Sequence, residues 1–188
     1  MISKEKVIEI LDKPEIYSSI NKYLEIMFLY KNSENLANDY NFQKKYNHFY
    51  RMGRRTKDFY NTYYCYMEKI RDNKNITFNE IFNYIKSNTN RNEASFSSKL
   101  LHTINNDMPI LDSIVLKNLN LYNEYKSRKS NKTEIYDKLN STYKELSYTH
   151  KYIVDEFNRK FLDIKISDIK KIDFVLWQLR WFYLDCMY

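Results

Sequence analysis

Glycine and proline are almost absent from this chain, and this scarcity limits its fold more than any other feature. Its 188 residues contain one glycine, Gly53, and two prolines, Pro14 and Pro109. A β-fold of this length would need a turn residue of this kind about every ten positions. We therefore expect an all-α fold. A Walker-type phosphate loop and a glycine-rich dinucleotide fingerprint are excluded, because both need several glycines close to the phosphates.

The length predicts a single compact helical domain over residues 1–188. Hydrophobic residues make up 43% of the chain and aromatic residues 17%, a composition that excludes a disordered protein. We expect about seven or eight helices around an aromatic-rich core. They include helices near residues 15–30, 41–51, 56–72, 78–87, 92–104 and 134–161, and a final helix that opens at Ser167 and continues through Phe182.

Local signals mark where several of these helices begin and end. Ser3, Thr56, Thr77 and Ser167 are the expected N-caps, and Glu80 completes a capping box with Thr77. Gly53 is expected to end the 41–51 helix in a left-handed C′ conformation. Pro109 ends the preceding helix, and Asp112 or Ser113 caps the next one. Residues 126–132 are expected to form a polar, basic loop.

Positive charge is concentrated between residues 40 and 57, where the chain has no acidic residue. Six cations lie there, and their number nearly equals the net charge of +7: Lys44, Lys45, Arg51, Arg54, Arg55 and Lys57. Such a segment is typical of proteins that neutralise phosphates. The alternative is a solvated helix face whose aromatic residues turn into the core: Phe42, Tyr46, Phe49 and Tyr50. We call residues 40–57 the basic segment.

A second candidate site follows from the order of residues 95–119. A helix carrying Lys99, a short loop and the run Pro109-Ile110-Leu111-Asp112-Ser113-Ile114-Val115 resemble the active-site region of helix-hairpin-helix DNA glycosylases. The resemblance implies a nucleophilic amine at Lys99 and a catalytic carboxylate at Asp112, with the 92–119 hairpin at or near the functional cleft. Asn90-Arg91-Asn92-Glu93 replaces the glycine hairpin of that family. The alternatives are a solvated Lys99 and an Asp112 that only caps its helix.

A further resemblance covers more of the chain. The segments Asn75–Phe78, Glu93–Leu119 and Lys170–Trp177 are similar to an uncharacterised family of small, all-helical bacterial proteins. This resemblance implies a helical fold and no particular activity.

The sequence predicts a nucleic-acid-binding protein, with duplex DNA as the favoured ligand and glycosylase or lyase chemistry at Lys99 and Asp112. The alternative is a non-enzymatic interaction module whose exposed tyrosines bind a protein partner. We expect no cofactor, and no zinc site, because the three histidines are scattered and the two cysteines form no CxxC pair. Residues 1–6 lack an apolar leader and no apolar run is long enough to span a membrane, so we expect a cytoplasmic protein.

Overall fold

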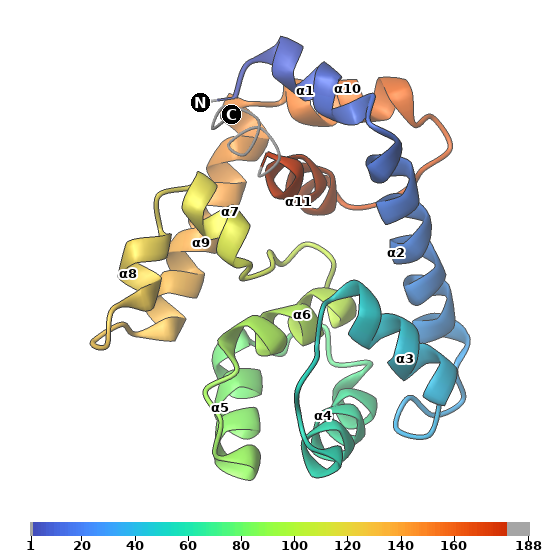
Figure 1. The fold of residues 1–188 in the computed structure, drawn as a ribbon, viewed down its shortest axis with the longest axis vertical. Helices are drawn as coiled ribbons and strands as arrows, with labels where there is room; N and C mark the ends of the chain where they lie inside the picture. Colours follow the sequence, from blue (N-terminus) through green and yellow to red (C-terminus); the bar gives the residue numbers. More distant parts are fainter. Residues whose placement is uncertain (1, 180–188) are drawn as a thin grey trace. The chain divides into compact units, whose positions relative to one another are not determined.

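The computed structural model describes residues 2–179, which form helices and no strand (Figure 1). The all-α class is confirmed. Within this part of the chain there are eleven helices, so the expected seven or eight is too low. In chain order they are α1 (Lys4–Leu11), α2 (Pro14–Asn32), α3 (Tyr40–Phe49), α4 (Lys57–Ile70), α5 (Phe78–Thr89), α6 (Ala94–Ile104), α7 (Ser113–Asn118), α8 (Tyr122–Lys126), α9 (Lys132–Thr149), α10 (Tyr152–Lys160) and α11 (Asp168–Gln178).

Two local features raise the number of helices. The five-residue α8 has no side-chain cap and no buried residue, so neither a cap signal nor apolar spacing predicts it from the sequence. The expected 134–161 helix is divided into α9 and α10 at His150, where the backbone leaves helical geometry. Apolar residues keep their helical spacing across this break, and the sequence pattern therefore does not mark it.

The predicted N-caps are confirmed. Each cap side chain accepts a hydrogen bond from a backbone N–H in the first turn of its helix, and Thr77 with Glu80 forms the full capping box. Phe182, expected in the last helix, lies outside the described residues.

The prediction for Gly53 is wrong, because another residue takes the left-handed position that ends α3. Arg51 has φ 52°, whereas Gly53 has no positive φ. The N–H of Met52 donates to the carbonyl of Asn47 at 2.8 Å, and that of Arg51 to His48 at 3.3 Å. These two bonds form a Schellman motif with Arg51 at C′. The left-handed position is therefore Arg51, one residue after the Tyr50 C-cap and two residues before Gly53.

The chain divides into two compact units, residues 1–17 with 106–188 and residues 18–105. The single domain over residues 1–188 stays a prediction.

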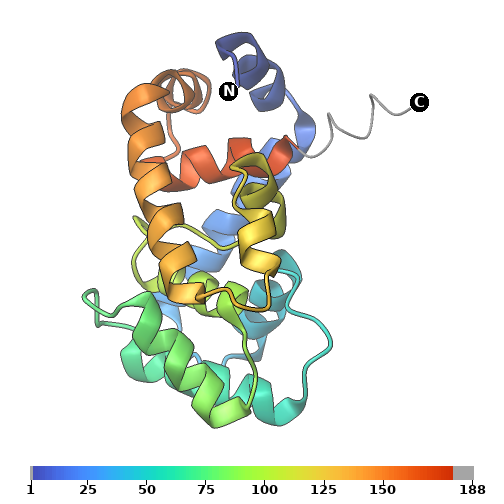
Figure 2. The same ribbon diagram turned by 90° about the vertical axis from the view of Figure 1, so that its left-hand side faces the viewer.

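In the first unit, α11 is the central helix. It contacts α1, α7, α9 and α10, and Figure 2 shows it running across α9. Lys170 and Asp173 of α11 form an ion pair at 2.8 Å, and both residues are buried. The hydroxyl of Tyr143 on α9 donates to the same carboxylate at 3.2 Å.

In the second unit, α5 packs against α4 and α6, and α2 runs beside α3 in the opposite direction. Tyrosines fill much of this core. The hydroxyls of Tyr46 and Tyr63 lie 3.1 Å apart, and the latter donates to the carbonyl of Phe96 at 2.9 Å. Burial raises the pKa of both phenols above their usual range. Over residues 2–179, no helix is both long and apolar enough to cross a membrane.

Candidate functional site

Helix α3, the loop after it and the first residue of α4 carry the basic segment. Asp39 caps α3, and its carboxylate accepts the N–H of Phe42 at 2.9 Å. Phe42, Tyr46 and Tyr50 face the core and are buried, as the alternative interpretation expected, and Phe49 is half-buried. The same helix leaves Lys44 and His48, four residues apart, exposed on its outer face. The core and the charged surface are therefore two faces of one helix.

The six predicted cations fall into two groups. Lys44, Arg51, Arg54 and Lys57 are exposed, whereas Lys45 and Arg55 are half-buried. Arg51 and Arg54 both have positive φ, 52° and 61°, in the loop that joins α3 to α4. Lys57 is the first residue of α4, directly after the Thr56 cap.

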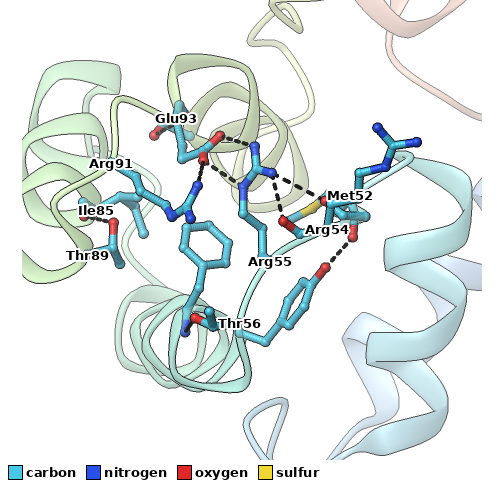
Figure 3. Close-up of polar contacts among 12 residues, drawn as sticks. Met52, Arg54, Arg55, Thr56, Ile85, Thr89, Arg91 and Glu93 are labelled. Carbon is cyan, nitrogen blue, oxygen red and sulfur yellow. Dashed lines mark hydrogen bonds and ion pairs between the residues drawn. The ribbon is translucent and has the colours of Figure 1, made fainter.

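Arg55 forms a two-bond ion pair with Glu93 (Figure 3). Its Nε and a terminal nitrogen donate to the two carboxylate oxygens of Glu93 at 2.7 and 3.0 Å, and this bond raises the pKa of the guanidinium. The guanidinium carbon lies 5.0 Å from the ring centroid of Phe96. Arg91 approaches the same carboxylate at 3.9 Å. Arg55 therefore ties the loop to the start of α6, and its charge is largely compensated.

Lys45 is paired with α2. Its Nζ lies 2.8 Å from the Glu25 carboxylate. Beside this pair α2 and α3 form a pocket of about 430 Å³, which we call the α2–α3 pocket. It brings Lys22 next to the basic segment, although the sequence alone does not point to this residue. Helical spacing places Lys22 and Glu25 on one face of α2, but only the pairing of α2 with α3 shows what that face meets.

Lys99 lies on α6 and is buried, so the expectation of a solvated lysine is wrong. Its Nζ donates to the backbone carbonyl of Tyr50 at 2.9 Å and lies 5.2 Å from the centroid of the Phe96 ring. Tyr50 is the C-cap of α3. The ammonium thus binds a carbonyl at the end of the helix that carries the basic segment. A positive charge at the C-terminal end of a helix also interacts favourably with the helix dipole.

Asp112 caps α7, as one interpretation predicted, and its carboxylate accepts the N–H of Ile114 at 2.8 Å. It belongs to the first unit, whereas Lys99 belongs to the second. Their joint catalytic role stays a prediction. The described residues include no group of three or more His, Cys, Asp or Glu side chains that could hold a metal ion.

No protein-family model, curated protein sequence or solved structure matches this chain significantly.

Proposed function

We propose that this protein binds nucleic acid, with duplex DNA as the favoured ligand, through the exposed cations of the basic segment. The observation that carries the proposal is the set of four exposed cations on one acid-free stretch of chain, Lys44, Arg51, Arg54 and Lys57. Their neutralisation of phosphates would release counterions, which is the main source of affinity in such complexes.

The geometry separates contact residues from supporting ones. Lys45 and Arg55 each already pair with a carboxylate of the protein, so a phosphate would have to compete with Glu25 or Glu93. We assign phosphate contact to the four exposed cations and assign Arg55 to holding the loop that presents Arg51 and Arg54.

Binding of a labelled duplex by a matched pair of variants tests this assignment. One carries Lys44→Gln, Arg54→Gln and Lys57→Gln. The control carries Lys31→Gln, Lys69→Gln and Lys86→Gln, three exposed lysines of the same unit that lie outside the basic segment. Both lose the same charge. We expect the first variant to bind at least about tenfold more weakly than the control at low salt. Equal affinities would overturn the proposal.

A base-excision step at Lys99 and Asp112 is the enzymatic part of the proposal. The Lys99 amine would have to release the Tyr50 carbonyl and lose a proton before it could attack a sugar C1′. The new C1′–N bond would form as the bond between C1′ and the base breaks, and the base would leave with a proton. Borohydride trapping on a duplex that contains an abasic site detects the resulting imine. Trapping that is lost in Lys99→Ala and reduced in Asp112→Asn supports this step. Wild-type protein that binds the duplex without trapping, or unchanged activity in both variants, excludes it.

The alternative partner is a protein that contacts exposed tyrosines. Among the described residues, the large exposed side chains include Tyr17, Tyr40 and Tyr148 on α2, α3 and α9. An interface centred on such rings is apolar and depends little on ionic strength, whereas a phosphate-driven complex weakens steeply with salt. The salt dependence of binding therefore separates the two classes of partner.

A further inference from the structure

The α2–α3 pocket combines positive charge with an aromatic wall. It has a volume of about 430 Å³, within the range of sites that hold a small organic ligand. Its lining residues come from two helices: Lys22, Glu25 and Ile26 from α2, and Asn41, Lys44, Lys45, His48 and Phe49 from α3.

The charges of the pocket favour an anion. Glu25 is its one carboxylate and is already paired with Lys45 at 2.8 Å. Lys22 and Lys44 are exposed, and no ion pair joins either ammonium to another residue in the described part of the chain. Lysine ammonium groups of this kind bind phosphate as point charges.

The apolar side of the pocket favours a flat ring. Phe49 packs edge-on against Tyr50 at 4.9 Å between centroids and lies 6.3 Å from the Tyr23 ring, so its position is fixed from behind. Ile26 completes this side. One turn before Lys44, Tyr40 is 76% exposed at the start of α3. Aromatic rings beside lysines are the features on which unpaired bases stack.

We propose that the α2–α3 pocket binds one unpaired nucleotide of a DNA strand, with its phosphate on Lys22 and Lys44 and its base against Phe49. This inference rests on the proposed function, because the adjoining duplex would follow the basic segment. A base inside a duplex is stacked on its neighbours and cannot enter the pocket. The preferred ligand is therefore a duplex that carries a single-stranded end.

The test compares a fully paired duplex with a duplex that carries a short single-stranded overhang, both with the same number of phosphates. We expect the wild-type protein to bind the overhang duplex about tenfold more tightly. Lys22→Gln removes one pocket cation outside the basic segment, and Phe49→Leu removes the ring but keeps an apolar side chain. Each should remove most of the preference while binding of the paired duplex changes less than about threefold. Lys31→Gln is the control on the same helix and should retain the preference.

The outcomes separate the inference from the proposed function. If the wild type binds both duplexes equally, or if Lys22→Gln and Lys31→Gln behave alike, the pocket assignment is wrong while phosphate binding by the basic segment stands. If neither duplex binds at low salt, both are wrong. Competition distinguishes a phosphate site from a nucleotide site: thymidine monophosphate should compete at a lower concentration than inorganic phosphate. Equal competition by the two overturns the role of Phe49.

Discussion

At the scale of single residues, asparagine and arginine occupy the left-handed backbone positions that glycine usually takes. Arg51, Arg54, Asn90 and Asn120 have positive φ, and no glycine does in the described residues. Asn120 follows the C-cap of α7 and completes a Schellman motif in which Leu121 donates to Leu116 at 2.8 Å. Asparagine tolerates this conformation better than most residues, whereas arginine does not. The strain at Arg51 and Arg54 is thus located in the proposed phosphate-binding loop.

Exchanging residues at this turn should separate stability from binding. Arg51→Gly should raise the free energy of unfolding by about 1 kcal/mol, because glycine takes the left-handed C′ position without strain. The same change should weaken duplex binding by removing one phosphate contact. Gly53→Ala should change the stability by less than about 0.5 kcal/mol, since a Cβ at Gly53 meets no atom within 4 Å. Urea unfolding measures both values, and a loss of stability in Arg51→Gly would contradict this account of α3.

The same substitution should lower the stability of the protein at Arg55 and the salt dependence of duplex binding at Arg54. Arg55→Gln breaks the paired bonds to Glu93 and should lower the free energy of unfolding by about 2 kcal/mol, with little change in the salt dependence of duplex binding. Arg54→Gln should leave stability within about 0.5 kcal/mol and reduce the steepness of the salt dependence by about one unit. The reverse pattern would show that Arg55 is the phosphate contact.

At the scale of elements, the sequence predicted helix N-caps better than the points at which helices end or divide. Ser3, Thr56 and Thr77 each accept a hydrogen bond from the backbone N–H three residues away, so the sequence alone identifies them. The division at His150 and the turn at Arg51 depend on packing against other helices. The local sequence carries no signal for such packing. The same limit applies to Lys99, whose partner Tyr50 is 49 residues distant in sequence.

The cap of α7 gives a test that keeps structure and chemistry apart. Asp112→Ala should lower the free energy of unfolding of the protein by about 1 kcal/mol, because Ile114 N–H loses its acceptor. Asp112→Asn keeps an acceptor and should retain nearly all of that stability. Urea unfolding compares the two variants. If Asp112→Asn is as unstable as Asp112→Ala, the cap is not the source of the effect, and Asp112→Asn is no longer a structure-neutral probe of the abasic-site reaction.

At the scale of the whole molecule, an abundance of buried tyrosine predicts sensitivity to alkaline pH. Burial raises the pKa of Tyr30 to about 12, and the pKa values of Tyr46, Tyr63 and Tyr64 are raised further for the same reason. The folded state keeps these phenols protonated at a pH where the unfolded chain releases the protons. Their contribution to stability is therefore complete below about pH 10 and is lost as the pH rises from there through the folded-state values.

This predicts a falling free energy of unfolding above about pH 10, accompanied by cooperative appearance of tyrosinate absorbance. Between about pH 10 and 12, Tyr30→Phe should reduce the slope of the unfolding free energy against pH by the amount that corresponds to one proton. A free energy that stays constant over this interval would contradict the buried-tyrosine core.

The sequence also predicted the fold class more completely than the candidate site. Scarce glycine and helical apolar spacing are properties of the whole chain, and they suffice for an all-α protein. The site depends on pairings between distant segments, as Lys22 beside Lys44 and Arg55 with Glu93 show. Counting cations along the chain did not show that Lys45 and Arg55 are paired with carboxylates of the protein.

The most direct test of nucleic-acid binding is the salt dependence of the affinity for a labelled duplex. With four exposed cations on phosphates, the logarithm of the association constant should fall with the logarithm of salt concentration with a slope of about −4. Replacing Lys44, Arg54 and Lys57 with glutamine should bring the slope to about −1, and the control triple variant should keep the wild-type slope. No binding at low salt, or a slope that is the same in all three proteins, would contradict the account and direct the search to protein partners.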